Sequence, residues 1–476
     1  MLKNYFKIAL RNLWKNKGFS FINISGLAVG MASAVLILLW IQSELTFDKF
    51  HEKRERIYQA WNKATFSGKL QCWSTTPKVL AGALSRDLPE VEHSTRVNWP
   101  SNFLFSLGEK RIAEQGNIVD SNFLQVFTFP LVKGNAKSAL YQQNSLVVTE
   151  KFAKKLFGDE DPMGKIVKLD NKDNFTVTGV LKDLPANTRF DFNYLIPWSY
   201  LRQTGGEDEN WGNNSTSTYV LLKENASFAS ANNKIKKIKA RYDKNEDPKW
   251  EMFIYPMSRW RLYSSFENGV EQGGRIAFVK MFGIVAIFIL LIACINFMNL
   301  STARSEKRAK EVGIRKVVGA QKKSLVAQFI GESILLAFFA GILAIVIVTV
   351  SLPGFNSLTE KKLFIDFASG EFWLIALSFI ILTGLLAGSY PAFFLSSFQP
   401  IKVLKGTFRA ANALITPRKV LVILQFTFAI LLITCTIVVK QQIDYAKDRE
   451  TGYNKNNLVY HFLTGDLTKN YDLVKN

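Results

Sequence analysis

Cysteine and histidine are scarce in this chain of 476 residues. Two of the three cysteines lie inside long apolar segments, so the polar part of the chain retains a single cysteine and cannot build a disulfide framework. Structural zinc needs clustered Cys and His ligands, and their wide spacing here excludes such a site. The residues in question are Cys72, Cys294, Cys435, His51, His93 and His461.

The sequence motifs of common catalytic sites are also missing. It contains no HExxH and no G-x-S-x-G segment. The nearest approach to a phosphate-binding loop is GDEDPMGKI, starting at Gly158, which has one residue too many and lacks the Ser or Thr that should follow the lysine. We interpret the acidic pair Asp159 and Asp161 as a solvated turn. We therefore expect no catalytic residue, no metal ion and no bound cofactor, so a partner must supply any energy that the protein uses.

Five long segments are almost free of charged residues. They cover residues 20–41, 278–300, 325–351, 372–395 and 420–440. About 20 apolar residues are enough to cross the roughly 30 Å core of a bilayer. One such segment could be a buried core helix, but five predict a multi-pass membrane protein. The first segment exceeds the apolar core of a signal peptide and no small-residue cleavage site follows it, so we predict an uncleaved anchor.

The formal net charge of +21 is concentrated in short segments between the predicted spans. Residues 1–18 carry five Lys or Arg and no acid, residues 301–325 carry eight against two acids, and residues 397–419 carry five and no acid. Residues 44–275, in contrast, hold 33 basic and 28 acidic residues. Short basic loops stay in the cytoplasm, so we predict a cytoplasmic N-terminus with residues 44–275 and 353–371 outside. Basic charge divided in this way excludes a nucleic-acid-binding face.

These observations predict a membrane α-helical protein, with about five transmembrane helices and a large α+β extracytoplasmic domain inserted between the first and second spans. The predicted order is a cytoplasmic amphipathic helix at 1–18, a first span at 19–43, the external domain at 44–275, three further spans at 276–400 that include a cytoplasmic segment at 301–324, a linker at 401–419, a fifth span at 420–440 and the start of a second external domain at 441–476.

The external segment contains both the alternating apolar pattern of β-strands and the spacing of amphipathic helices. SLVVTE, NFTVTGVLKD and STSTYVLLKE alternate apolar and polar residues between turn residues, which predicts strands. EKFAKKLFG predicts a short helix that Gly158 ends, and SFASANNKIKKIKARY predicts an amphipathic helix. A domain of this size has room for two lobes, but the sequence does not place a boundary between them.

Small residues recur every four positions in the first span, at Gly26, Gly30 and Ala34. Such a ridge allows a second helix to approach closely in lipid. In the fourth span, Pro391 has no backbone N–H, so we expect the helix to kink or end there.

The cytoplasmic segment STARSEKRAKEVGIRKVVGAQKKS is basic and is interrupted by Gly313 and Gly319. The pair Glu306 and Lys310 supports a helix at i, i+4 spacing. We predict a short helix, a turn near Gly319 and then the third span. Glu332 lies about two turns into that span, where an ionisable residue is either functional or part of a polar interface.

Three segments resemble the MacB/FtsX-type permease family of ABC transporters. SLVVTEKFAKKLFGDEDPMGKIVKLDNKDNFTVTGVLKDLP resembles the family's periplasmic core domain, KRAKEVGIRKVVGAQKKSLVAQFIGES resembles the start of its permease domain, and SYPAFFLSSFQPIKVLKG resembles its Tyr-Pro-Ala…Pro-Ile motif. The matching positions include Phe157, Gly158, Gly164, Gly179, Glu332, Tyr390, Pro391 and Pro400. The N-terminal segment is similar to the duplicated form of this family known from Bacteroidota. Since a second external domain and three further spans are missing, we expect a truncated version of that form.

The resemblance implies a permease subunit in the bacterial inner membrane that works with a separate cytoplasmic ABC ATP-binding subunit. ATP would be used by that partner, and the movement would reach the external domain, which acts on an unknown substrate. A periplasmic adaptor or substrate protein would be a further partner, and the full-length form would be pseudo-dimeric. The residues expected to contact the ATPase are Arg308, Glu311, Gly313, Ile314, Arg315 and Gly319.

Two other functions remain open from the sequence. The family includes regulators of cell-wall hydrolases, which usually have a much smaller external domain. A membrane sensor or scaffold without a transport role would need a cytoplasmic signalling domain, and this chain contains none. Identification of the protein that co-purifies with the chain distinguishes these classes.

Overall fold

A computed structural model of the chain describes residues 17–243, 249–303, 305–398, 417–449, 452 and 471–475, without the side chains of residues 305–308, 310, 417, 418 and 474. Most of the predicted amphipathic helix 1–18, Pro400, most of the predicted linker 401–419 and most of the predicted start of a second external domain, 441–476, lie outside these residues. The chain divides into two units. One comprises residues 1–42 and 279–457, and the other comprises residues 43–278 and 458–476.

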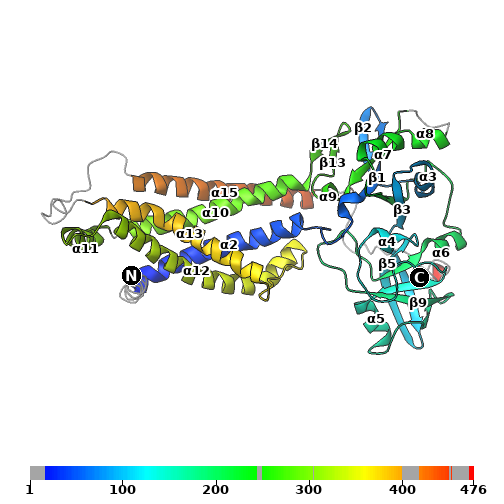
Figure 1. Cartoon of the computed structure of the whole chain (residues 1–476), viewed down its shortest axis with the longest axis horizontal. Coiled ribbons are helices and arrows are strands. Elements are labelled where there is room, and N and C mark those ends of the chain that lie inside the picture. Colours follow the sequence, from blue (N-terminus) through cyan, green and yellow to red (C-terminus); the bar gives the residue numbers. More distant parts are fainter. Residues whose placement is uncertain are drawn as a thin grey trace. The chain divides into compact units, whose positions relative to one another are not determined.

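The first unit is helical. Its five long helices run along one another in Figure 1, and all five are long and apolar enough to cross a membrane. They are α2 (Lys17–Leu45), α10 (Arg275–Ala303), α12 (Lys322–Thr359), α13 (Gly370–Ser396) and α15 (Pro417–Asp448). The five predicted spans are therefore confirmed as helices, each longer than its apolar sequence segment because polar turns extend the ends.

Two residues that the sequence marked as interruptions lie inside helices, so α13 does not end at Pro391, and the alternative of a kink there stays a prediction. Helix α13 continues through Pro391 to Ser396, and α11 (Ser305–Val317) continues through Gly313. Both residues are buried, and their neighbours Ala392 and Val312 belong to one apolar cluster. Tertiary packing here outweighs the lost hydrogen bond of proline and the low helix propensity of glycine.

Helices α2 and α10 approach each other at the small residues of the first span. A Cβ atom added at Gly30 would lie 2.4 Å from the Cβ of Ala293, and one added at Gly26 would lie 3.3 Å from the side-chain nitrogen of Asn296. Ala34, on the same ridge, is buried. The glycines therefore allow the two backbones to come close, as small residues do between helices in lipid.

We expect Gly30→Leu to destabilise this helix pair by about 1–3 kcal/mol, because the larger side chain overfills a packed contact. Gly18→Leu is a matched control, since Gly18 lies on the same helix and has no atom within 4 Å of an added Cβ. Thermal unfolding of both variants in detergent measures the difference. Equal midpoints for the two variants would contradict this packing.

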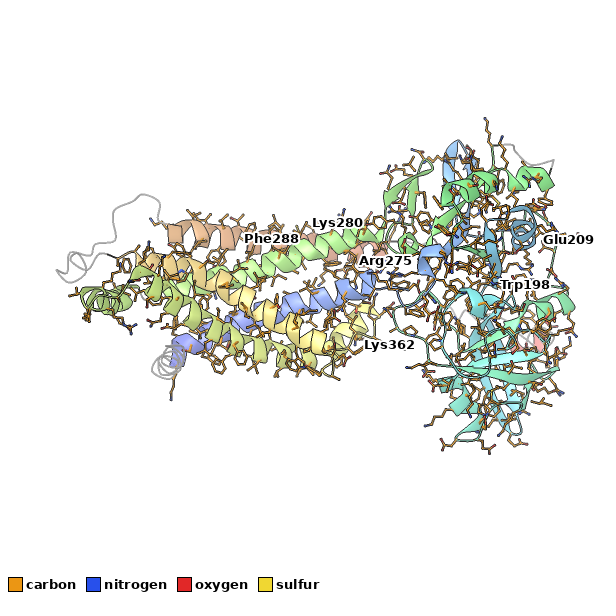
Figure 2. All side chains as sticks on the ribbon, in the orientation of Figure 1. Trp198, Glu209, Arg275, Lys280, Phe288 and Lys362 are labelled. Atoms are coloured by element: carbon orange, nitrogen blue, oxygen red, sulfur yellow. The ribbon has the colours of Figure 1, made fainter. Side chains whose placement is uncertain are left out.

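The other spans pack in two ways. Helices α12 and α13 also meet at glycines, since a Cβ at Gly388 would lie 2.6 Å from the Cβ of Ser333. Helix α15 contributes no buried side chain among those described. It contacts α10 through a hydrogen bond of 3.2 Å between the Asn299 and Gln425 amides, and through stacking of Phe288, which Figure 2 labels, on Phe428 at 4.6 Å.

The second unit is an α+β domain inserted between α2 and α10. Twelve strands form its main sheet, and two more form a small hairpin. The strands are β1 (Ile57–Phe66), β2 (Lys69–Trp73), β3 (Val91–Asn98), β4 (Ser101–Leu107), β5 (Lys110–Val119), β6 (Leu131–Lys133), β7 (Ser145–Thr149), β8 (Ile166–Leu169), β9 (Asp173–Leu181), β10 (Tyr194–Pro197), β11 (Thr216–Leu222), β12 (Glu251–Pro256), β13 (Ser265–Glu267) and β14 (Val270–Gly273).

One lobe of this domain is a closed ring of strands. The pairings run β5–β4–β8–β9–β7–β10, and β10 returns to β5 in parallel register with Tyr194 opposite Gly116. A Cβ at Gly116 would lie 2.3 Å from the carbonyl oxygen of Tyr194, so glycine is needed for this closure. Closure removes exposed strand edges. Alternate residues such as Phe105, Val167 and Phe175 are buried together in one apolar cluster.

The other lobe continues the sheet as β3–β11–β1–β12, and it is joined to the ring where β3 pairs with β5 at Val97 and Val119. Apolar residues of α3 (Leu80–Asp87), α7 (Phe228–Ile235) and α8 (Ile238–Tyr242) pack against it. The segment predicted as one amphipathic helix is therefore two helices. The short elements are η1 (Arg54–Arg56), α4 (Phe123–Val126), α5 (Glu150–Phe157), α6 (Trp198–Gln203), α9 (Met257–Trp260) and α17 (Tyr471–Lys475).

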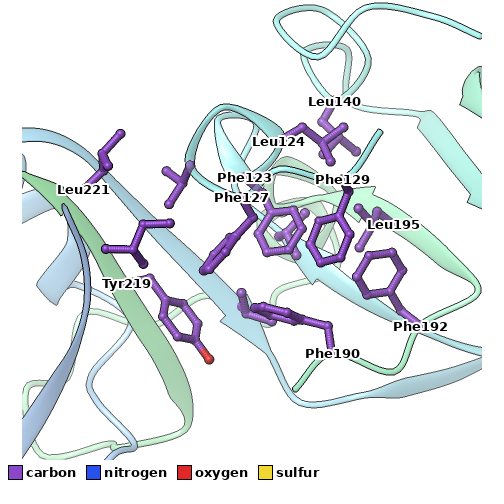
Figure 3. Packing of buried hydrophobic residues seen from close by; sticks show 14 of the residues in the cluster. Phe123, Leu124, Phe127, Phe129, Leu140, Phe190, Phe192, Leu195, Tyr219 and Leu221 are labelled. Carbon is purple, nitrogen blue, oxygen red and sulfur yellow. The ribbon is translucent and has the colours of Figure 1, made fainter. Parts of the chain in front are cut away.

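Aromatic side chains fill the core where residues from the two lobes meet. Phe123, Phe127 and Phe190 pack at centroid distances of 4.8–5.4 Å, mostly edge to face, and Tyr219 of β11 joins them. Figure 3 shows these rings beside Phe129 and Phe192. Such ring pairs stabilise the core beyond the burial of apolar area, because they favour particular relative orientations of the rings.

The family-like motif of the external segment has a structural role. The side chain of Thr149 accepts a hydrogen bond from the N–H of Phe152 at the start of α5, and Gly158 ends the helix with φ of 67°. Gly164, with φ of 73°, donates its N–H to Val177 at 2.8 Å. Positive φ at both glycines explains why this residue type occupies the turns.

His51 is buried between Phe50, Phe127 and Phe129, and its Nδ1 accepts a hydrogen bond from the backbone N–H of Thr128 at 3.1 Å. Burial lowers the pKa of His51 to about 3. Because the folded pKa lies below the unfolded value, the neutral ring contributes stability above about pH 6.5, and this contribution is lost as the pH falls toward 3.

We expect the unfolding free energy to fall by about 1.4 kcal/mol for each pH unit from this group between pH 6 and 4. His51→Gln removes the titrating group, so the difference in stability between wild type and variant should shrink as the pH falls. Chemical denaturation at several pH values measures this difference. A difference that stays constant with pH would show that His51 does not titrate on unfolding.

Candidate coupling site

Helix α11 follows α10 and precedes a sharp turn into α12. Gly319 adopts φ of 97° in that turn, and the N–H of Ala320 donates to the carbonyl of Arg315 at 2.9 Å. This arrangement is typical of a glycine that ends a helix. The helix and turn predicted from the sequence are therefore both present.

One face of α11 is buried against the neighbouring ends of two spans. Ala309 and Val312 are each 2% exposed. They share an apolar cluster with Leu325 and Phe329 of α12, with Ala392 and Leu395 of α13, and with Phe398 just beyond the end of α13. Because packed interiors have low compressibility, a displacement of α11 must move the ends of α12 and α13 with it.

A chain of polar contacts leads from the surface of α11 into α12. The Arg315 guanidinium donates to Glu311 at 2.7 Å and to the Gln328 side chain at 2.5 Å. Gln328 in turn donates to the carboxylate of Glu332 at 3.2 Å. Gln328 and Glu332 are 6% and 8% exposed. Buried polar side chains of this kind require hydrogen-bond partners within the protein.

Lys316 makes a second link, because its Nζ donates to the carbonyl oxygen of Phe398 at 2.9 Å, just beyond the end of α13. A cation near the C-terminal end of a helix is favoured by the helix dipole. Helix α11 is thus attached by a charged side chain to each of the two spans on which it packs.

The opposite side of α11 and the turn that follows it carry apolar residues that no described part of the chain covers. Ile314, Val317 and Val318 are 56%, 65% and 82% exposed, and the Glu311 side chain beside them is half-exposed. We call Ile314, Val317 and Val318 the apolar stripe. Three β-branched apolar residues exposed together at the C-terminal end of a short basic helix are suited to contact with another protein.

The structure thus assigns different positions to the predicted contact residues. Ile314 and Glu311 are on the exposed side, whereas Gly313 is buried and Gly319 forms the turn. Arg315 is engaged within the chain, and the side chain of Arg308 lies outside the described part of the chain. Sequence reasoning did not identify Val317, Val318 and Gln328. The unusual apolar residues within a basic segment could have indicated the first two.

The other motif residues pack against neighbouring residues of the chain. Tyr390 stacks on Phe394 at 5.8 Å near the end of α13, and Pro391 is buried in that helix. Gly179 lies in β9, where an added Cβ would be 3.1 Å from the side chain of Leu131. Within the described residues no group of three His, Cys, Asp or Glu could hold a metal ion.

These features define a multi-pass membrane protein with an α+β domain inserted between its first two spans. Residues 20–238 match the family model of the MacB-like periplasmic core domain, and residues 283–400 match that of the FtsX-like permease C-terminal domain. The chain belongs to the MacB/FtsX-type ABC transporter permease family, as its sequence motifs predicted.

Curated relatives carry export names. The chain is 24% identical over 431 residues to the pyoverdine export ATP-binding/permease protein PvdT of Pseudomonas syringae pv. tomato, covering 85% of this chain and 59% of that protein. It is 26% identical over 266 residues to the macrolide export ATP-binding/permease protein MacB of Bdellovibrio bacteriovorus, covering 54% of this chain and 38% of that protein. The chain thus spans less than two thirds of either relative.

Two solved structures are also similar to part of this chain. A domain of a putative permease protein from Porphyromonas gingivalis is 23% identical, with 43% of this chain and 92% of that chain covered and a TM-score of 0.37. The periplasmic region of MacB from Actinobacillus actinomycetemcomitans is 19% identical, covers 43% of this chain and 90% of that chain, and has a TM-score of 0.32.

Proposed function

We propose that this chain is the permease subunit of an ABC transporter and that a cytoplasmic ATP-binding subunit docks on α11. Its task is to couple ATP hydrolysis to movement of the inserted domain, for export or extraction of a substrate. The observation that carries this proposal is the two-sided character of α11. One face is fixed to α12 and α13, and the other exposes the apolar stripe.

The distribution of charge supports the orientation. The basic segments 1–18, 301–325 and 397–419 belong in the cytoplasm, which puts the inserted domain on the periplasmic side of the inner membrane. Helix α11 lies in the second of these segments, so its apolar stripe is accessible to a cytoplasmic partner.

The absence of a phosphate-binding loop from the sequence supports a partner as the source of ATP hydrolysis. The curated relatives are named ATP-binding/permease proteins, and this chain spans 59% of one and 38% of the other. We propose that this chain is not itself an enzyme, that it binds no cofactor, and that ATP binds to the partner. A second permease half would complete a pseudo-dimer, and a periplasmic adaptor or substrate protein would bind the inserted domain.

Purification of the tagged chain from detergent-solubilised membranes tests this function, with the co-purifying proteins identified by mass spectrometry. An ABC ATP-binding subunit with ATPase activity is the expected result. Recovery of a cell-wall hydrolase or a signalling kinase in place of an ATPase would contradict the transporter function.

A further inference from the structure

The first span ends in a buried carboxylate. Glu44 lies in the last turn of α2, and its side chain is 0% exposed. A buried carboxylate is tolerated only where hydrogen bonds and opposite charges replace water. The residues that stabilise Glu44 therefore identify the elements to which the end of α2 is attached.

Two arginines provide that stabilisation. Arg261 donates from Nε and Nη2 to the two oxygens of Glu44, both at 2.8 Å, and Arg275 donates from the same two nitrogens at 3.2 Å. Both pairs are bidentate, which fixes orientation as well as distance. The Arg261 guanidinium also lies 4.1 Å from the ring centre of Phe47, so it is held between the carboxylate and an aromatic face.

The two arginines come from different elements. Arg275 is the first residue of α10, the helix that forms the second span, and Figure 2 labels it at that end. Arg261 directly follows α9, whose Met257 and Trp260 are part of the main aromatic core. A single carboxylate thus connects the end of the first span, the start of the second span and the core of the inserted domain.

The residues after Glu44 extend this connection to a second segment. Asp48 adopts φ of 57°, and its carboxylate accepts hydrogen bonds from Thr188 Oγ1 at 2.7 Å, from the N–H of Arg189 at 3.0 Å and from Trp260 Nε1 at 2.9 Å. A non-glycine residue in the left-handed region persists only when its surroundings fix it. The side chain of Asn187 also donates to the carbonyl of Thr46 at 3.0 Å.

Residues 187–189 lie between β9 and β10, two strands of the closed ring, while α9 follows β12 of the other lobe. Residues 44–48 therefore hold segments from both lobes. An accessible cation or substrate site does not explain Glu44, because the carboxylate is fully buried and already accepts from four guanidinium N–H groups.

We infer that Glu44, Arg261 and Arg275 form a force-bearing joint through which movement of the first two spans reaches the inserted domain. We call these three residues the carboxylate joint. The inference rests on the proposed function, since the movement is the one driven by the ATP-binding subunit. Glu44 is a positioning residue in this account, and its effect is on transmission of movement.

The first test needs no nucleotide and no partner. Hydrogen exchange of the full chain in lipid nanodiscs is compared for wild type, Glu44→Gln and the matched control Glu55→Gln, whose carboxylate forms an exposed pair with Arg54. Loss of a buried ion pair should speed exchange in residues 43–51 about a hundredfold, while β11 and β12 stay protected. Exchange at the wild-type rate in Glu44→Gln would overturn the joint.

The second test adds the co-purified ATP-binding subunit and follows nucleotide-driven movement of the inserted domain by spin-label distances. We expect Glu44→Gln to lose this movement and Glu55→Gln to keep it. A double variant, Glu44→Cys with Arg261→Cys, is made in a background in which the three native cysteines are replaced by serine. This variant should lose the nucleotide-driven movement, and the movement should return when a bifunctional thiol reagent links the two positions. Covalent rescue distinguishes transmission of movement from a role in folding alone.

The possible failures are distinguishable. Movement in wild type and equally in Glu44→Gln overturns the joint and leaves the proposed function standing. A wild-type protein that binds no ATPase overturns the proposed function, and with it the transmission role of the joint.

Discussion

Replacing Ile314 and Val318 together by glutamate is expected to weaken binding of the ATP-binding subunit by about a hundredfold or more, because two desolvated charges would face an apolar contact. Both side chains are mostly exposed in the chain itself. Surface substitutions of this kind change folding stability by only about 0.5 kcal/mol. Loss of binding therefore cannot be attributed to misfolding. Affinity for the ATPase, measured on immobilised nanodiscs, gives the effect.

Lys323→Glu is the matched control for this double variant. Lys323 is exposed in the first turn of α12, and its replacement changes the net charge by the same two units. We expect a small effect that disappears at high salt, because exposed charges are screened. If the control weakened binding as much as the double variant, then charge and not the apolar stripe would determine docking.

Arg315→Ala is expected to separate binding from coupling. The ATPase should remain bound, since Arg315 faces Glu311 and Gln328 within the chain. Substrate-stimulated ATP hydrolysis should fall by about tenfold to a hundredfold, because the link between α11 and α12 is lost and buried Gln328 is left without its charged partner, at a local cost of about 1–3 kcal/mol. Stimulated and basal hydrolysis rates measured side by side give the result.

Two further variants define the role of Arg315. Arg315→Lys keeps the charge but cannot contact two partners with a planar fork, so an intermediate loss is expected. Glu311→Ala, which removes the exposed partner at i, i+4 spacing, should reduce coupling less than Arg315→Ala. Full coupled activity in Arg315→Ala would show that the basic residues of α11 serve only to set topology.

Much of the fold was predictable because it depends on local patterns. Five apolar segments predicted five helices, and the position of Gly158 after Phe157 predicted the end of α5. The presence of a large inserted α+β domain followed from the alternating strands and the short helix between the first two spans. Such features are encoded within a few adjacent residues.

The remaining features depend on residues that are distant in the sequence. The closed ring needs β10 to pair with β5, which lies more than 70 residues earlier. Glu44 and Arg261 are 217 residues apart, so nothing near Glu44 indicates that it is buried. The continuation of α13 past Pro391 has the same origin, because packing of α13 against α11 and α12 outweighs the local preference of proline.

For Arg315, the structure adds partners within the chain to the ATPase contact that the sequence predicted, and that contact stays a prediction. The sequence identified the basic segment and its family resemblance, and from these we predicted a direct contact with the ATPase. In the structure, the guanidinium is directed to Gln328, 13 residues ahead on the next helix. The exposed side of α11 carries aliphatic residues beside Glu311, and we propose that docking and transmission use different faces of the same helix.

The central claim is that ATP binding by the partner moves the inserted domain through α11. Spin labels at two exposed positions, Glu109 in the inserted domain and Lys362 in the loop after α12, report this movement in nanodiscs by their distance distribution. We predict a distribution that shifts when ATP is added to the complex and that no longer shifts in Arg315→Ala. An unchanged distribution with and without ATP, in a wild-type complex whose ATPase is active, would contradict the account.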